Sequence, residues 1–286
     1  MRGLRTRLLA WIDAQEHLDL VARASMIALL VTAHHDPVLM AITAAVALVV
    51  LTRPAARRHP FTWIALGVGT LAWHLPSWFR YDNHVWLTAA WAVGFGLCLL
   101  ARNPHQATEV EGRWLVAIIF GAGALWKVGA TDFRSGDFFR YAVISDSRFA
   151  TLASWVGGID RSALGLDGAD VAGLVAAPHE PVTLETDGRL EAMAWVFTVW
   201  GMFIELAVAA LWILPLRPRH IWTRHVALLV FVATTYLVVP VGGFGCLLMA
   251  IGLSQVRDRP MLRRAYLAAF AALLAYGPVW RVILGP

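Results

Sequence analysis

The sequence predicts an all-α protein: a polytopic bundle of transmembrane helices with a small extracytoplasmic helical cap. Of its 286 residues, 59% are hydrophobic and 15% are charged, whereas average soluble domains are about 45–50% apolar and about 25% charged. The mean hydropathy is +0.62, and several nearly uncharged stretches reach the roughly 18 residues that are typical of a membrane-spanning helix. The composition excludes a disordered chain, a collagen-like repeat and an ordinary soluble enzyme.

The predicted membrane elements are apolar runs separated by charged or turn-forming residues. The first two runs follow each other across His34, His35 and Asp36, so we expect them to form a tight helical hairpin. The eight runs cover residues 19–33, 36–52, 60–79, 84–101, 113–131, 192–215, 225–255 and 262–284.

The run 225–255 is unusual, because VVPVGGFG (Val238 to Gly245) stands at its middle. The proline and the three glycines of this motif would break a helix. Both flanks of the run are rich in arginine, which favours a chain that returns to the side from which it came. We therefore expect a broken or re-entrant pair of half-helices, and eight or nine membrane elements in total.

The net charge of +5 is unevenly distributed along the chain. Segment 132–191 holds ten acidic and five basic residues and sums to −5, so the rest of the chain carries +10. Most of this positive charge lies at the ends of the apolar runs, in arginine clusters at 2–7, 53–58, 217–224 and 257–264. This is the positive-inside pattern of membrane proteins rather than a phosphate-binding face. It predicts a multi-pass protein of the cell membrane with a cytoplasmic N-terminus, an extracytoplasmic segment 132–191 and no nucleic-acid partner.

Residues 1–286 are expected to form a single membrane domain that carries segment 132–191 as an insertion. The two cysteines, Cys98 and Cys246, each lie inside an apolar run and outside any C-x-x-C motif. They therefore predict neither a zinc site nor a disulfide framework, and no metal is expected. The sequence also contains no P-loop, G-x-S-x-G, H-E-x-x-H or Rossmann fingerprint.

Lys127 is the one lysine in a chain that otherwise uses arginine for its basic residues. A desolvated lysine can lose its proton near neutral pH, whereas arginine effectively cannot. Lys127 shares a helical face with Gly123 and Ala124, whose small side chains would let another helix approach closely. It lies about 21 Å along the helix from Arg113, in the outer third of the membrane. The alternative is a lysine that extends its amine to the outer headgroups.

Two further polar residues are candidates for the same site. His84, in RYDNHVW, stands at the outer end of its run and therefore on the side of Lys127, where it could bind a substrate oxygen or help to carry a proton. Glu205 lies in the middle of an apolar run, where a carboxylate should be paired or should line a cavity. Its candidate partners are Lys127, His74 and Arg23. A structural tie between helices is the alternative to a catalytic role.

Three patches, in this order, resemble the motifs of one family. YDNHVWL (Tyr81 to Leu87) is similar to an Asn-His motif at the start of a membrane helix. FGAGALWKVGATDFRSGDFF (Phe120 to Phe139) is similar to a small-residue helix followed by a lysine, an aromatic residue and a glycine. GMFIEL (Gly201 to Leu206), with the later GGFGCLLMAIG, resembles the closing helices. The family is the HTTM membrane domain, which includes the vitamin K-dependent gamma-carboxylases.

The resemblance implies a function that the residues alone do not specify. In the carboxylases, the lysine of this motif deprotonates vitamin K hydroquinone, and the Asn-His histidine assists. The oxygenated quinol then removes a proton from a peptide glutamate, whose carbanion takes up carbon dioxide. Carried over, the catalytic residues would be Lys127 and His84. The quinol, of the vitamin K or menaquinol type, would be bound by Asn83, Trp126 and Glu205, and the partners would be the lipid bilayer and a secreted or membrane peptide. Trp126 stands where the carboxylases have a second lysine.

Two other classes of function remain open from the sequence. The first is a non-catalytic membrane protein with a role in interaction, immunity or assembly, in which Lys127 and Glu205 only hold helices together. The second is a small-molecule carrier. Its main support is VVPVGGFG, because broken helices often line transport sites.

Overall fold

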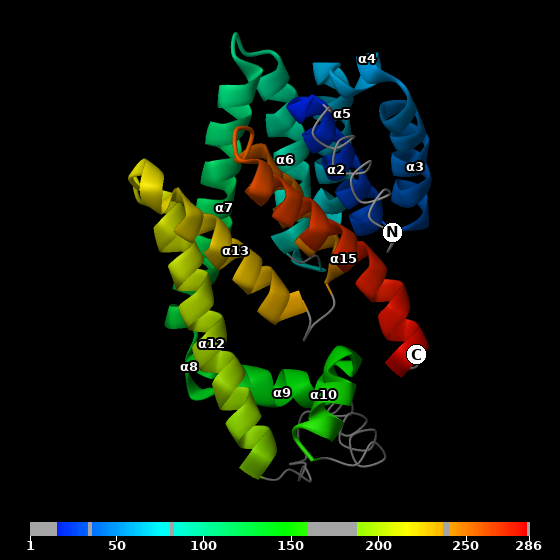
Figure 1. Ribbon diagram of the computed structural model, residues 1–286. Coiled ribbons are helices and arrows are strands. Elements are labelled where there is room, and N and C mark those ends of the chain that lie inside the picture. The colour runs from blue at the N-terminus through cyan, green and yellow to red at the C-terminus, as the bar shows by residue number, and fades with distance from the viewer. Residues whose placement is uncertain (1–15, 34–35, 81–82, 159–187, 237–240, 285–286) are drawn as a thin grey trace, which may run out of the picture.

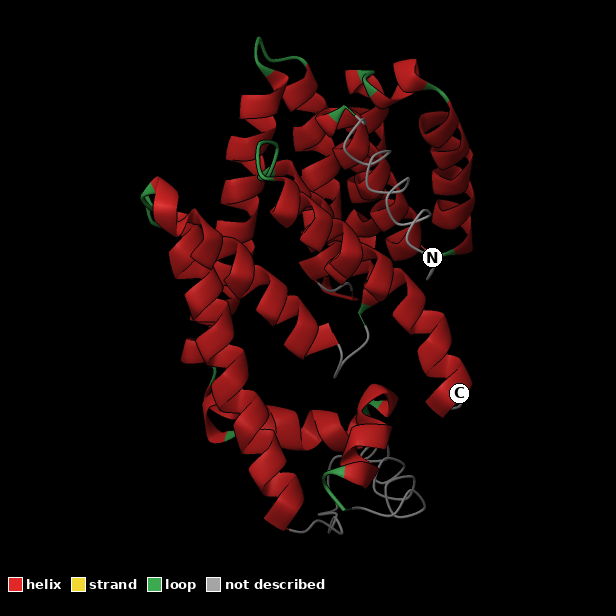
Figure 2. Ribbon diagram, in the orientation of Figure 1, coloured by secondary structure: helices red, strands yellow, loops and turns green. Residues whose placement is uncertain are grey.

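The computed structural model describes residues 16–33, 36–80, 83–158, 188–236 and 241–284. All regular structure in these ranges is helical, as Figure 2 shows, and the predicted all-α class is confirmed. The helices are α2 (His17–Thr32), α3 (Pro37–Thr52), α4 (Pro54–Arg57), α5 (Pro60–His74), η2 (Leu75–Arg80), α6 (Asn83–Leu99), α7 (Pro104–Gly129), α8 (Thr131–Ser135), α9 (Asp137–Ser145), η3 (Ser147–Phe149), α10 (Ala150–Trp155), α12 (Gly188–Ile213), η4 (Pro218–His220), α13 (Ile221–Tyr236), α14 (Gly242–Ser254) and α15 (Pro260–Leu284).

Each predicted apolar run corresponds to one or two of these helices. The run 225–255 is divided between α13 and α14, so the expected break is present, but the three glycines lie within α14, which begins at Gly242. Residues 237–240, which include the proline, lie outside the described part of the chain. Within the described residues, α12 is the helix that is both long and apolar enough to cross a membrane, with a mean hydropathy of 2.0. Shorter apolar helices cover Pro37–Thr52, His84–Leu99 and Gly242–Ser254.

Prolines and capping side chains fix where several helices begin. Asp36 accepts hydrogen bonds from the backbone N–H groups of Val38 and Leu39 at 2.9 and 3.0 Å, immediately before α3. Asn103 caps α7 by accepting from the N–H of Gln106. A proline follows each of these caps, where its missing N–H costs nothing. The cap at Asn103 explains why α7 starts nine residues before the expected span 113–131.

The arginine-rich connections lie toward one end of the molecule. In Figure 1, α4 and the α6–α7, α12–α13 and α14–α15 turns occupy the upper part, whereas α8, α9 and α10 lie at the lower end. Several arginines bind the carbonyl groups that helix C-termini leave unpaired, where a cation also complements the helix dipole. Arg57 donates to Val50 and Leu51 at the end of α3, and Arg113 of α7 donates to the last turn of α12.

Helix α14 is the centre of the bundle. Every residue from Phe244 to Ser254 is buried, which fits a sequence that is apolar on all sides. This helix packs mainly against α2 and α15. The short helices α9, η3 and α10 form a second hydrophobic cluster with the start of α12, built from Val143, Ile144, Phe149, Ala153, Leu190 and Met193. This cluster is the described part of the expected cap; residues 159–187 lie outside the described ranges.

The contact between α5 and α6 generates a first prediction. A Cβ added at Gly67 would meet Ala89 O and Val93 N at 2.7 Å, whereas one added at Gly69 meets nothing within 4 Å. We expect Gly67→Ala to lower the free energy of unfolding by about 1–3 kcal/mol, because the two helices must separate. Gly69→Ala is the matched control and should leave stability unchanged or slightly raised. Thermal unfolding of the detergent-solubilised protein measures both, and equal melting temperatures would contradict this packing.

The histidine at the start of α2 predicts a pH dependence. His17 lies two residues before the expected span 19–33, and its burial lowers its pKa from 6.5 to about 4. Between these values the unfolded chain takes up a proton that the folded protein does not, so stability must fall as the pH drops from 6.5 toward 4. We expect melting temperatures at pH 7 and pH 5 to differ less in His17→Phe than in the wild type. The same pH slope in both proteins would exclude a contribution from His17.

Candidate functional site

Lys127 and Glu205 form an ion pair between α7 and α12. Lys127 lies in the last turn of α7, and Glu205 lies in the middle of α12. The Lys127 Nζ donates to the Glu205 Oε1. Their side chains are 17% and 15% exposed, respectively. Of the three partners that the sequence allowed for Glu205, the structure selects Lys127.

Aromatic and small residues surround this pair. The Lys127 Nζ lies 5.3 Å from the ring centroid of Phe133, which begins the aromatic cluster of α8 and α9. The negative face of a ring attracts a cation at this distance. On the other side, an added Cβ at Gly123 would lie 3.1 Å from the Glu205 Oε2. The glycine therefore provides the room in which the carboxylate sits.

Among the described residues, only one of the two carboxylate oxygens of Glu205 has a hydrogen-bond partner. Its Oε1 accepts the proton of Lys127, whereas Oε2 is buried and has no hydrogen-bond partner among the described residues. Tyr236, at the end of α13, is buried and lies within electrostatic range of this carboxylate. The ion pair therefore engages one carboxylate oxygen and leaves the other without a donor from the described residues.

His84 is placed at the same end of the bundle but is not part of the ion pair. It is the second residue of α6, and its ring centroid lies 4.4 Å from that of Phe244 on α14. The ring of Phe244 in turn contacts Tyr236, with 6.2 Å between the centroids. An aromatic contact series therefore runs from His84 through Phe244 to Tyr236. The sequence did not single out Tyr236, although its position just before the VVP break of the chain was a usable signal.

The remaining predicted site residues differ in how well they are placed. Asn83 begins α6, but its side chain lies outside the described part of the structure. Trp126 is 55% exposed, and its ring lies 6.2 Å from those of Phe133 and Phe138. It adjoins the aromatic cluster on the outside of α7, next to the ion pair rather than within it.

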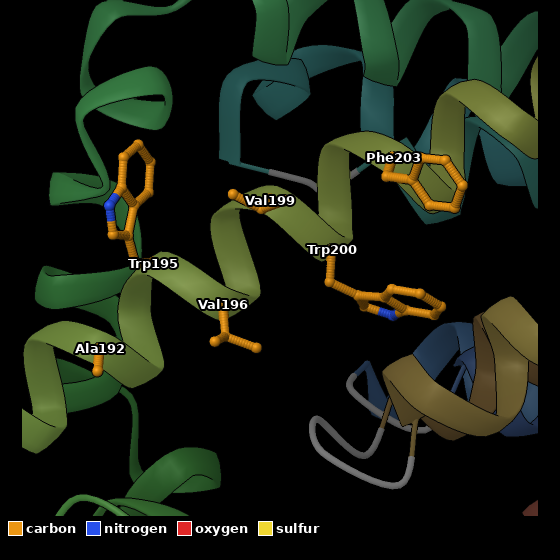
Figure 3. Close-up of a pocket in the computed structure, with 6 residues that line it drawn as sticks. All are labelled: Ala192, Trp195, Val196, Val199, Trp200 and Phe203. Atoms are coloured by element: carbon orange, nitrogen blue, oxygen red, sulfur yellow. The ribbon is translucent and has the colours of Figure 1, made fainter.

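An open apolar groove follows one face of α12. Figure 3 shows the six residues that line it, Ala192, Trp195, Val196, Val199, Trp200 and Phe203. The indole of Trp200 donates to the hydroxyl of Thr234 on α13 at 3.0 Å. Val196 and Val199 are offset from Glu205 by more than a quarter turn at 100° per residue, so the groove faces away from the carboxylate. It is a feature of the outer surface of α12 and not a wall of the ion-pair site.

Within the described residues, no three His, Cys, Asp or Glu side chains gather as metal ligands would. The chemistry that the geometry offers is proton transfer at a cation–carboxylate pair in a setting of low polarity, where electrostatic interactions are stronger than in water.

The glycine beside the pair generates a prediction. A side chain at Gly123 points at the Glu205 carboxylate, whereas one at Gly121 meets nothing within 4 Å. We expect Gly123→Val to displace Glu205 and lower the free energy of unfolding by about 1–3 kcal/mol relative to the control Gly121→Val. The two variants share the intrinsic cost of valine in a helix, so their melting temperatures can be compared directly. A more stable Gly123→Val would show that the carboxylate does not occupy this space.

Comparisons with protein-family models, with curated proteins and with solved structures give no match for this chain. The resemblance to the HTTM membrane domain therefore rests on the three short motifs alone.

Proposed function

We propose that the chain crosses a cell membrane several times and that its Lys127–Glu205 pair removes a proton from a lipid-soluble acid, such as a quinol, near the outer leaflet. The single observation that carries this proposal is the partly buried ion pair formed by the one lysine of the chain. A structure that needs only a fixed positive charge could use arginine here, as it does elsewhere. Of the two basic side chains, only lysine can give up and regain a proton.

The distribution of apolar side chains supports a membrane setting. Large hydrophobic side chains point outward along α3, α7 and α12, among them Ile42, Leu48, Ile118, Leu125 and Phe203. Apolar surface this continuous is rare in proteins that face water. With 26 residues, α7 is also about 39 Å long, which exceeds the roughly 30 Å of a bilayer core.

The proposed orientation follows from charge. Arginines are concentrated at the end that holds α4 and the α6–α7 turn, and the positive-inside rule assigns that end to the cytoplasm. Lys127 lies at the other end of α7, toward α8 and α9 (Figure 1). A site there would receive its substrate from the outer leaflet or the extracytoplasmic space.

The residues around Lys127 suit a ring-shaped acid of low polarity. Phe133 lies against the amine, and the rings of Phe138 and Phe139 extend the aromatic surface. A bound quinol would supply an acidic hydroxyl, and Lys127 would stabilise the resulting oxyanion through its positive charge. His84 and Asn83, at the start of α6, remain the residues that we predict to assist in binding or deprotonating the quinol. Carboxylation of a peptide partner rests on the family resemblance alone.

A second candidate function has its own support. A direct ion pair between two long helices is also what a structural tie would look like, and many intramembrane charges pair in this way. On that alternative the protein is a non-catalytic membrane interaction, immunity or assembly factor. The division of 225–255 into α13 and α14 supports a third candidate, a small-molecule carrier.

Substitution of Lys127 separates catalysis from the structural tie. The probe is 2-methyl-1-naphthol, whose naphtholate absorbs at longer wavelength than the neutral form. Lys127→Ala should reduce the bound naphtholate at least about tenfold, because no cation stabilises it. Lys127→Arg should keep the melting temperature but slow naphtholate formation in stopped-flow measurements by at least about tenfold, because arginine does not release its proton. A rate equal to that of the wild type in a folded Lys127→Arg would favour the structural tie.

Co-purification identifies the natural ligand. The protein is extracted from its membrane in mild detergent, and lipophilic redox molecules are sought by mass spectrometry, with Lys127→Ala as the control. We expect a quinone in the wild type and less of it in the variant. No quinone in a well-folded wild-type sample would exclude a tightly bound quinol.

A further inference from the structure

We infer that Glu205 is the final acceptor of the proton that Lys127 removes, so that the two side chains act as a relay. This inference rests on the proposed function, because it assigns the second half of the same proton transfer. It gives Glu205 a role different from the ligand-binding one that the sequence motifs imply.

The two oxygens of Glu205 have different surroundings. Oε1 accepts from the Lys127 amine, and Oε2 is buried beside Gly123. The Nζ of Lys127 contacts the carboxylate and also lies 5.3 Å from the ring centroid of Phe133. A substrate hydroxyl bound on the Phe133 side would contact the amine, and its proton would pass to Glu205 through Lys127.

The charge of the pair requires a second acceptor. A lysine that is paired with a carboxylate is an ammonium group, and an ammonium group cannot take up a proton until it has released one. The carboxylate in direct contact is the nearest acceptor.

The transfer balances without any redox partner. The O–H bond of the substrate breaks and an N–H bond forms on Lys127, while another N–H bond of Lys127 breaks and an O–H bond forms on Glu205 Oε1. The electron pair stays on the substrate oxygen. The products are a substrate oxyanion beside an ammonium group and a neutral Glu205, so the total charge of the site does not change.

The experiment counts protons released to the solvent. The protein in detergent is titrated with 2-methyl-1-naphthol, and bound naphtholate is measured by absorbance against empty micelles. Calorimetry in two buffers of different ionisation enthalpy gives the number of protons released. In the wild type we expect about zero protons per naphtholate, and in Glu205→Gln about one, because the acceptor is then the buffer.

A matched control uses a second carboxylate of the same helix. Glu191 pairs with Arg140 on α9 and is largely exposed, so Glu191→Gln should release as few protons as the wild type does. If Glu205→Gln does not fold, Glu205→Asp keeps the acceptor and should also release about zero protons.

The outcomes distinguish the two proposals. If naphtholate forms in the wild type and one proton per naphtholate is released, the relay is wrong. Lys127 would then pass the proton to solvent rather than to Glu205. If no naphtholate forms in the wild type under any of the conditions, the proposed function itself fails. A purely structural role of Glu205 would lower the melting temperature in Glu205→Gln but would not change the number of protons per naphtholate.

Discussion

The whole structure follows from one constraint: a chain with this little charge must satisfy its backbone within helices and must give each buried charge a partner. Helices satisfy their own backbone groups except at the two ends. The arginines of the α4 end bind the exposed carbonyls of helix C-termini. The lysine of the opposite end binds a carboxylate. Charged side chains therefore lie where a backbone carbonyl or another charged group would otherwise lack a partner.

In a chain with so few charged residues, the Lys127–Glu205 ion pair needs an explanation. Removing two charges from water is costly, and a well-packed pair of apolar side chains would often hold two helices equally well. Retention of a partly buried pair therefore invites a functional explanation. The geometry adds that one oxygen of Glu205 has no donor among the described residues and that Phe133 flanks the amine. A structural tie does not need either feature, whereas a site that moves a proton can use both.

The surroundings of the pair are built from several helices. Helix α7 provides the lysine and the glycine that makes room for the carboxylate, α12 provides the carboxylate, and α8 provides the aromatic ring. The end of α13 brings Tyr236 to the same place, and its contact with Phe244 links the site to His84. The open groove of α12 lies on another face and belongs to the outer surface. The chemistry of the site and the surface of the bundle are therefore separate features of α12.

The amino-acid pattern alone was enough to predict the helical class and most helix boundaries, and it singled out Lys127 as a candidate. Local rules suffice for these, because prolines and capping residues such as Asp36 and Asn103 act on the next turn of the chain. The single lysine among many arginines is visible without any structure. The break within 225–255 was likewise predicted, although the three glycines turned out to begin α14 rather than to interrupt it. The pairing of Glu205 with Lys127 rather than with His74 or Arg23, and the contact of His84 with Phe244, are visible only in the folded protein. Those pairings depend on how far each helix is rotated and shifted against its neighbours, and a sequence pattern that repeats every 3.6 residues carries no information about that.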